Sequence, residues 1–230
     1  MPITPPQQNW ALFLDLDGTL LDIAERPDAV VVPEGLVAVL AALRDFLGGA
    51  LAVVSGRPMA DLDRLLRPLA CDCGAEHGAV LRYRGANAVL GEGVPPVWVA
   101  RIRVAAQDWP GVLVEEKTRG VAVHYRQAPQ YARAIEQLLR SLVTADRRFQ
   151  ILCAHMAFEL RDAEVHKGRA VAEFMAREPY CGRLPVFVGD DVTDEDGIRE
   201  AVLQGGLGLR VAEAFAGETA KVRAWLAGLA

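Results

Sequence analysis

Two acidic clusters, each directly after an apolar run, carry the clearest chemical signal in this sequence: Asp15 with Asp17, and Asp190 with Asp191 and Asp194. Open α/β sheets bind ligands at the carboxyl ends of their strands, so we expect both clusters in one crevice. Carboxylates gathered in this way repel one another unless a cation lies among them. The donor set predicts a hard, oxygen-liganded ion, Mg²⁺ before Ca²⁺, because the sequence has no glycine-spaced calcium loop.

Each cluster also has a purely structural explanation. Solvated aspartates in an ordinary strand-to-loop turn account for Asp15 and Asp17 when that motif is taken alone. Thr193 suits the N-cap of a helix, with Asp194 and Asp196 in the first turn near the positive end of the helix dipole. It is the occurrence of two such clusters in one chain that favours a cation site.

Two further segments suit an anion. Ser55-Gly56-Arg57 follows another apolar run and precedes Pro58, so a hydroxyl, a glycine and free amides stand ahead of a helix, which suits phosphate binding. The alternative is a plain serine N-cap. Lys167 opens a later predicted helix. A lone lysine is usually a solvated surface charge, but an acidic crevice that receives an anion needs a cation.

Apolar periodicity predicts the elements that position these residues. The chain begins strand, helix, strand, helix, a pattern typical of a parallel sheet with right-handed crossovers. The four elements are expected at residues 10–15, 33–47, 50–54 and 58–69. After residue 162 the sequence again predicts alternating helices and strands. Helices are expected at 170–176 and 194–202 and strands at 185–189 and 207–211. A last helix has an apolar stripe of Val222, Trp225, Leu226 and Leu229.

The middle of the chain has a different pattern of predicted elements. Short strands are expected at 80–83 and 88–90, helices at 97–109 and 131–143, and hairpins at 112–126 and 149–161. These elements predict a small α+β module with an antiparallel sheet. We therefore expect an α/β core of residues 1–79 and 162–230, interrupted by an inserted module of residues 80–161.

Composition narrows the class of protein. The chain has 230 residues, a net charge of −5 and mean hydropathy of +0.16. The negative charge argues against nucleic-acid binding, and no stretch approaches the ~18 apolar residues of a membrane span. We predict that the cysteines, at 71, 73, 153 and 181, are reduced thiols in the cytoplasm. Residues 1–9 hold three prolines and no basic residue, which predicts an unstructured start without a signal peptide.

Taken together, the motifs resemble the haloacid dehalogenase (HAD) superfamily of phosphatases. The resemblance rests on four elements in order: Asp15-x-Asp17-Gly-Thr, Ser55, Lys167, and Gly189-Asp190-Asp191-x-x-Asp194. It implies a Rossmann-like α/β core with a parallel sheet and an inserted α+β cap of the C2 type, which confers substrate specificity. The module predicted at residues 80–161 matches that cap.

Within the superfamily, the chain is similar to the trehalose-6-phosphate phosphatase family. The similarity covers nearly the whole chain and includes Ala75-Glu-His-Gly78, Glu115-x-Lys117, His124-Tyr-Arg126, Glu159-x-Arg161 and Gly189-Asp-Asp-x-Thr-Asp-Glu195. It implies Mg²⁺-dependent hydrolysis of trehalose 6-phosphate to trehalose and phosphate, the last step of trehalose biosynthesis. It also implies a functional association with trehalose-6-phosphate synthase.

The resemblance assigns roles to individual residues. Asp15 is expected to be the nucleophile and Asp17 the general acid and base, with Lys167 as the third catalytic residue. Asp15, the backbone carbonyl of Asp17, and Asp190 are expected to hold Mg²⁺, while Asp191 and Asp194 orient its waters and Lys167. The residues expected to bind substrate are Asp17, Gly18, Thr19, Ser55, Gly56, Arg57, Glu115, Lys117, His124, Arg126 and Glu159.

The substrate residues of the inserted module share a face of its predicted sheet. Side chains alternate between the faces of a strand, which places Glu115 and Lys117 with His124 and Arg126. Glu159 shares its parity with Arg161 in the second hairpin. A solvated sheet face explains this pattern equally well, and it is the family resemblance that favours a sugar-binding face.

Other functions are compatible with parts of this pattern. Another phosphatase with the same cap, acting on sucrose 6-phosphate or mannosyl-3-phosphoglycerate, would keep the chemistry and change the cap contacts. A phosphomutase would use the same nucleophile and retain the phosphoryl group on a sugar. A non-enzymatic sugar-phosphate-binding module would usually lack Asp15 or Asp17, and both are present.

Overall fold

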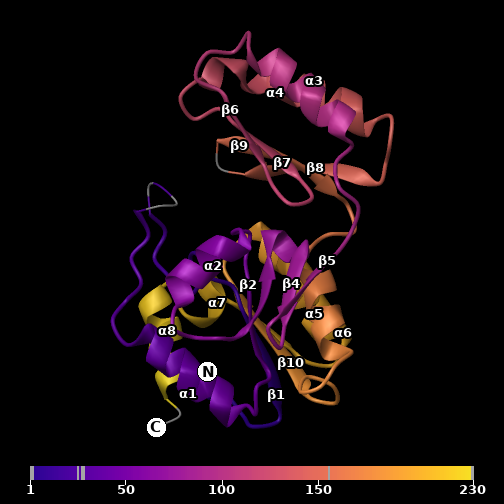
Figure 1. Ribbon diagram of the computed structural model, residues 1–230. Helices are drawn as coiled ribbons and strands as arrows, with labels where there is room; N and C mark the ends of the chain where they lie inside the picture. Colours follow the sequence, from indigo (N-terminus) through magenta and orange to yellow (C-terminus); the bar gives the residue numbers. More distant parts are fainter. Residues whose placement is uncertain (1–2, 25, 27–28, 155, 229–230) are drawn as a thin grey trace. The chain divides into compact units, whose positions relative to one another are not determined.

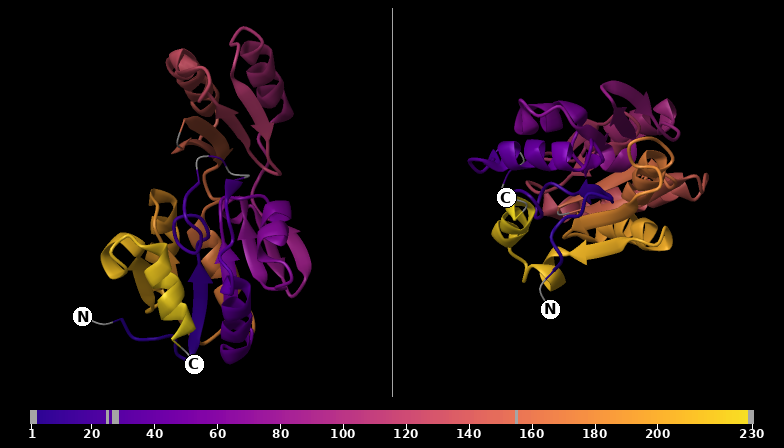
Figure 2. Two further views of the ribbon diagram at one scale, coloured as in Figure 1. Left: turned by 90° about the vertical axis from the view of Figure 1, so that its left-hand side faces the viewer. Right: turned by 90° about the horizontal axis from the view of Figure 1, so that it is seen from below.

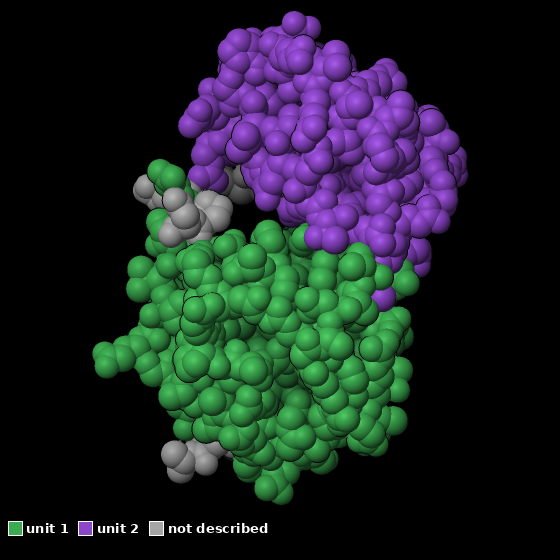
Figure 3. All heavy atoms as spheres, in the orientation of Figure 1, with its two compact units in different colours: residues 1–89, 166–230 green, residues 90–165 purple. Residues whose placement is uncertain are grey.

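The computed structural model describes residues 3–24, 26, 29–154 and 156–228 and divides into two compact units (Figure 3). Unit 1 contains residues 1–89 and 166–230, and unit 2 contains residues 90–165. Met1 and Pro2, at the expected unstructured start, lie outside the described residues, and residues 3–9 form no helix or strand. No helix in the described part of the chain has both the length and the apolarity needed to cross a membrane.

Unit 1 is built on a seven-stranded sheet (Figure 1). Its first five strands are parallel, and the last two form an antiparallel hairpin at one edge. In sheet order the strands are β11 (Leu207–Arg210), β10 (Leu184–Gly189), β1 (Trp10–Leu14), β2 (Leu51–Val54), β3 (Asp72–Ala75), β4 (Val80–Tyr83) and β5 (Ala86–Val89). The parallel core with crossover helices confirms the predicted α/β class.

Helices follow the parallel strands as the apolar spacing predicts. In α1, Leu36, Leu40 and Leu43 are buried, which is the i, i+4, i+7 stripe of a helix packed on a sheet. Helices α1 and α8 pack together, as do α5 and α6, and the two pairs lie on opposite sides of the strands in Figure 1. The helices of unit 1 are α1 (Leu36–Phe46), α2 (Met59–Leu66), α5 (Lys167–Met175), α6 (Glu195–Leu203), α7 (Val211–Ala214) and α8 (Thr219–Ala227).

The centre of this core surrounds β1, whose five residues are all buried. The Phe13 ring lies 5.6 Å from the Tyr180 ring and 6.1 Å from the Phe174 ring, measured between centroids. Fully burying one large apolar side chain contributes about 1.5–3 kcal/mol. The strand that leads to Asp15 is therefore buried along its whole length between β10 and β2, in the interior of the unit (Figure 2).

The boundary of the insert differs from the expected one. The hairpin of β4 and β5 pairs with β3 and extends the sheet of unit 1, so the first boundary falls after Val89 and not after residue 79. The second falls after Val165 and not after residue 161. The strand β3 is absent from the elements expected from the sequence, because its sequence, Asp-Cys-Gly-Ala, shows no alternation of apolar and polar residues.

A buried hydroxyl secures β2, β3 and the segment before β10. The Tyr180 hydroxyl oxygen lies 2.9 Å from the Leu51 carbonyl oxygen and 3.0 Å from Asp72 Oδ2, so its single proton is shared between two acceptors. We expect Tyr180→Phe to lower the free energy of unfolding by about 1–3 kcal/mol, because it leaves buried acceptors without this donor. Urea denaturation checks this, with Tyr83→Phe as the control, since the Tyr83 hydroxyl bonds the Glu178 carbonyl in a more exposed position. Equal losses in the two variants would contradict it.

Unit 2 is a four-stranded antiparallel sheet covered on one face by two helices. The strands, in sheet order, are β6 (Leu113–Glu116), β7 (Val121–His124), β9 (Ala157–Asp162) and β8 (Phe149–Ala154), and the helices are α3 (Pro96–Ala106) and α4 (Ala132–Val143). The covered face contributes Val121, Val123 and Leu160 to a core shared with Ile102 of α3 and Leu139 of α4. This α+β architecture confirms the predicted character of the insert.

Candidate active site

The candidate active site lies where adjacent parallel strands of unit 1 end. Asp15 follows β1, Ser55 follows β2 and Asp190 follows β10, and these strands are neighbours in the sheet. The carboxyl ends of parallel strands share one edge, so residues far apart in the sequence meet there. A single lysine, Lys167, enters from the first residue of α5.

Lys167 joins two carboxylates in the interior. Its Nζ lies 2.6 Å from Asp15 Oδ1 and 2.5 Å from Asp194 Oδ1, and all three side chains are almost completely buried. Burial alone lowers the pKa of Lys167, but the two carboxylates more than reverse this and raise it, so the side chain is a cation. The pKa of Asp15 is raised to about 8, mainly by burial, against the lowering influence of Lys167.

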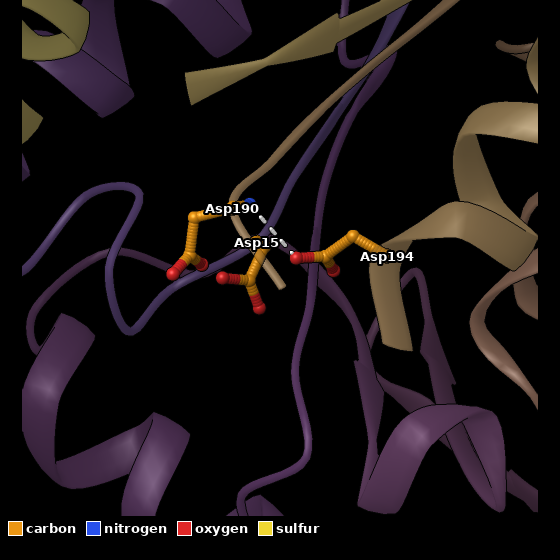
Figure 4. Close-up of side chains that lie close together, drawn as sticks. All are labelled: Asp15, Asp190 and Asp194. Atoms are coloured by element: carbon orange, nitrogen blue, oxygen red, sulfur yellow. Dashed lines mark hydrogen bonds between the residues drawn. The ribbon is translucent and has the colours of Figure 1, made fainter. Parts of the chain in front are cut away.

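Asp190 completes a group of three carboxylates. Oxygen atoms of Asp15, Asp190 and Asp194 lie within 4.8 Å of one another, and Figure 4 shows the carboxylates turned toward a common point. Gly18 lies beneath Asp190: its backbone has φ +81°, and a Cβ on it would stand 2.1 Å from Asp190 Oδ2. Burial and the nearby Asp194 raise the pKa of Asp190. Thr19, expected to bind substrate, donates instead to Asp190 Oδ1 at 3.3 Å.

The donors at this point fit a divalent cation. All are carboxylate oxygens, which are the ligands that hard cations prefer, and one ammonium opposes three carboxylates. Burial, and secondly the neighbouring Asp194, raise the pKa of both Asp15 and Asp190, and a bound cation would oppose this rise. A cavity of about 570 Å³, lined in part by Gly18, Asp190 and Arg223, opens beside Asp190 and gives access from solvent.

Asp17 is separated from the other carboxylates by a strong partner. The Arg57 guanidinium binds it in the bidentate manner, Nε to Oδ2 at 2.6 Å and Nη2 to Oδ1 at 2.7 Å. The hydrogen bond to Asp17 raises the pKa of Arg57 despite its partial burial. Because both carboxylate oxygens of Asp17 bind Arg57, the side chain of Asp17 is not among the three carboxylates that gather at this point. Arg57 was expected to bind phosphate, and its partner in this structure is Asp17.

The serine of the predicted phosphate loop is buried and acts within the loop. Ser55 Oγ accepts from the Arg57 amide at 3.2 Å, and the Ser55 amide donates to the Gly74 carbonyl of β3 at 2.8 Å. Pro58 and not Ser55 directly precedes α2. The plain N-cap explanation of Ser55 is therefore wrong, and its hydroxyl stays a candidate phosphoryl ligand.

In the acidic segment after β10, aspartate side chains accept hydrogen bonds from the backbone amides of their own turn. Asp194 Oδ2 accepts from the backbone amides of Asp190 at 2.9 Å and Asp191 at 3.0 Å. Asp191, and not Thr193 as expected, caps the short 3₁₀ helix Val192–Asp194. Asp194 thus binds both Lys167 and the turn that carries Asp190.

A turn after β3 reaches the same edge, and sequence reasoning did not assign it a role. Glu76, His77 and Gly78 have φ of +49°, +57° and +101°. Residues other than glycine are rarely left-handed, and each such residue costs of order 1–3 kcal/mol. The signal in the sequence was the motif Ala75-Glu-His-Gly78, which lies at the end of a fourth parallel strand once β3 is recognised.

The polar face of unit 2 carries most of the residues predicted to bind sugar. Glu115 Oε2 lies 2.7 Å from His124 Nε2, and Lys117 Nζ lies 2.5 Å from Glu159 Oε2. The hydrogen bond with His124 lowers the pKa of Glu115. Arg126 lies in a turn after the end of β7, so the alternation used to place it with His124 does not extend to it.

The chain is similar to known proteins over most of its length. Residues 13–218 match the family described as Trehalose-phosphatase. A protein of Sinorhizobium fredii named "Probable trehalose-phosphate phosphatase" is 43% identical over 210 residues, which covers 88% of this chain and 78% of the relative. The trehalose-6-phosphate phosphatase of Escherichia coli is 34% identical over 206 residues, covering 88% and 77%.

Solved structures share the fold. One described as a trehalose-6-phosphate phosphatase related protein has a TM-score of 0.69 at 25% identity and covers 94% of each chain. The C-terminal domain of the C. albicans trehalose-6-phosphate phosphatase has a TM-score of 0.74 at 20% identity, covering 97% of this chain and 93% of the other. A phosphatase of the HAD superfamily from Bacteroides thetaiotaomicron has a TM-score of 0.58 at 16% identity, covering 82% and 80%. The chain therefore belongs to the trehalose-phosphatase family of phosphoric monoester hydrolases.

Proposed function

We propose that the protein hydrolyses trehalose 6-phosphate to trehalose and inorganic phosphate, with Mg²⁺ as its metal. The observation that carries this proposal is the group formed by the buried Asp15, Lys167 and Asp194 together with the exposed Asp190, in a chain whose relatives are named for this substrate. A carboxylate nucleophile, a cation beside it and a divalent-metal donor set are the parts that phosphoryl transfer through an aspartyl-phosphate requires.

The first step forms a covalent intermediate. An Asp15 carboxylate oxygen attacks phosphorus in line, the bond between phosphorus and the sugar oxygen breaks, and Asp17 gives its proton to the departing oxygen. In this structure Arg57 binds both carboxylate oxygens of Asp17, which is the ionised form. To act as the acid, Asp17 takes up a proton on one oxygen and gives up that bond, and the remaining bond to Arg57 keeps the carboxyl group in place for the transfer. Ser55 and Lys167 bind the phosphoryl oxygens, and Lys167 offsets their negative charge.

The second step regenerates the enzyme. Asp17, now ionised, takes a proton from water as that water attacks phosphorus, and the bond between phosphorus and Asp15 breaks to release inorganic phosphate. When bound by Asp15, the Asp17 carbonyl and Asp190, Mg²⁺ supplies electrostatic compensation between the nucleophile and the phosphate dianion. Asp191 and Asp194 support that arrangement, and Gly18 and Thr19 shape the floor beneath Asp190.

A phosphate-release panel tests the proposed substrate. We expect the greatest kcat/KM with trehalose 6-phosphate, lower values with sucrose 6-phosphate, mannosyl-3-phosphoglycerate and glucose 6-phosphate, and loss of activity after chelation that Mg²⁺ restores. Equal hydrolysis of glucose 6-phosphate would contradict the assigned substrate, and a product that keeps its phosphate on sugar would indicate a phosphomutase. Activity unaffected by chelation would contradict the metal.

The polar face of unit 2 is proposed to bind the sugar hydroxyls through Glu115, Lys117, His124, Arg126 and Glu159. Glu159 is buried and paired with Lys117, so it is held in place for such a contact. This role is what separates an enzyme selective for a disaccharide phosphate from a general phosphatase.

Removing one charge from this face tests the role. We expect Glu159→Gln to raise KM for trehalose 6-phosphate by about 10- to 100-fold with a smaller change in kcat, since a hydrogen bond to a charged group is worth roughly 1.5–3 kcal/mol. The matched control is Glu116→Gln, which removes the exposed ion pair with Arg103 from the opposite face of the same hairpin. Steady-state kinetics on both variants decide it, and equal effects would contradict a sugar contact at Glu159.

The protein is proposed to act in the cytoplasm, together with the enzyme that makes its substrate. A cytoplasmic location follows from the expected reduced thiols, and the activity would consume the product of trehalose-6-phosphate synthase. A functional association with that enzyme belongs to the proposal, and co-purification of the two proteins tests it.

A further inference from the structure

The turn at residues 76–78 is hydrogen-bonded to the loop that follows β2. The backbone amide of Glu76 donates to the Arg57 carbonyl at 2.9 Å, and that of His77 donates to the Ser55 carbonyl at 2.9 Å. On its other side, a Cβ at Gly78 would stand 3.0 Å from the His166 carbonyl, next to Lys167. The left-handed turn therefore touches both the Ser55–Arg57 loop and the start of α5.

The imidazole of His77 rests directly on Gly56. A Cβ built on Gly56 would stand 2.5 Å from His77 Cε1 and 2.6 Å from Nε2, well inside contact distance. Gly56 is not among the residues with positive φ, so its backbone accepts an alanine without strain. The absence of a side chain at position 56 is thus explained by the His77 ring and not by the backbone.

The His77 ring lies against the Ser55–Arg57 loop, which positions a residue of the proposed reaction. Between Ser55 and Pro58, this loop carries the guanidinium that binds both oxygens of Asp17. A shift of about 1 Å in a positioning group can cost about 10²-fold in rate. A contact that fixes the loop from the side of β3 therefore acts on Asp17 without touching it.

We propose that His77 is a positioning residue for the phosphoryl-transfer step: its ring, placed on Gly56 by the left-handed turn, holds the Ser55–Arg57 loop so that Arg57 orients Asp17. This role rests on the proposed function, in which Asp17 transfers the proton. It also gives the strained backbone a use, because in this structure the left-handed turn carries the ring that lies against Gly56.

The test is a double-mutant cycle on His77→Asn and Gly56→Ala. Asparagine tolerates the left-handed backbone, so His77→Asn keeps the turn and removes the ring. We expect each single variant to lower kcat for trehalose 6-phosphate by about 10- to 100-fold with little change in KM. The double variant should be no slower than His77→Asn, because the new Cβ then has room. In His77→Asn, amide hydrogen exchange of residues 54–58 should become faster.

The control is Arg84→Asn, which makes the same change of residue type at another left-handed position, φ +47°, in the turn between β4 and β5. We expect this variant to keep wild-type kcat. Losses in kcat that multiply in the double variant, or unchanged exchange of residues 54–58 in His77→Asn, would overturn the positioning role. Failure of the wild-type chain to hydrolyse trehalose 6-phosphate would overturn the proposed function instead, because the exchange experiment needs no substrate.

Discussion

Asp15→Asn is expected to reduce phosphate release by about 10⁴-fold or more, the scale on which removal of a nucleophile acts. The amide of asparagine has the shape of the carboxylate but is a poor nucleophile toward phosphorus. Lys167 keeps Asp194 as a partner in this variant, so the fold should survive. The measurement is inorganic phosphate released from trehalose 6-phosphate, with circular dichroism to confirm the fold.

A trapping experiment sharpens this result. Wild-type protein quenched in acid during turnover should carry phosphate in a bond that hydroxylamine cleaves, as an acyl phosphate does, and Asp15→Asn should carry none. Asp17→Asn is the matched control, because it alters the neighbouring carboxylate and leaves the nucleophile in place. Turnover of Asp15→Asn near the wild-type rate would contradict the nucleophile assignment.

Lys167→Met should damage both stability and activity. Breaking a buried ion pair by removal of one partner costs about 3–5 kcal/mol, because it leaves an uncompensated charge in the interior. Here two buried carboxylates, Asp15 and Asp194, lose the same cation, and the pKa of Asp15, already raised by burial, should rise further without Lys167. A protonated Asp15 is a poor nucleophile, and we expect kcat to fall by at least about 10³-fold. Urea denaturation and phosphate release measure the two effects.

Lys221→Met is the control for that variant. Lys221 pairs with Glu218 at 2.7 Å, but about half of each side chain is exposed. The free energy of unfolding should therefore stay within about 0.5 kcal/mol of wild type, as for most surface substitutions. Similar losses of unfolding free energy in Lys167→Met and Lys221→Met would show that the burial of Lys167 does not cause the loss of stability.

The parts of the site that could be predicted from sequence are those set by local pattern. A buried strand ending in Asp15 and another ending at Asp190 are recognisable because the carboxylates directly follow apolar runs. Parallel topology then places both at one edge, and the structure brings them within 4.8 Å of each other and of Asp194. The family resemblance supplied the order of these motifs, and the match over residues 13–218 confirms it.

The parts that could not be predicted depend on pairing across long separations. The bond between Arg57 and Asp17 joins residues 40 positions apart, and nothing in either motif specifies it. The hairpin of β4 and β5 has the same local pattern whether it extends the sheet of unit 1 or belongs to the insert, so the sequence did not place it correctly. The strand β3 buries Asp72, which local polarity argues against, because Tyr180 and the Arg84 amide bond its carboxylate.

The position of β1 between β2 and β10 has a consequence for synthesis of the chain on the ribosome. Trp10 pairs with Leu184, so one edge of the most apolar strand has no partner until most of the chain has been made. An unpaired apolar strand edge can pair with other chains, so the risk of aggregation is greatest while β1 waits for β10. Unit 2 is continuous in sequence and can complete its own sheet during that time. Lys167 emerges late as well, so the strand that pairs with the free edge of β1 is made soon after the cation that compensates the charge of Asp15.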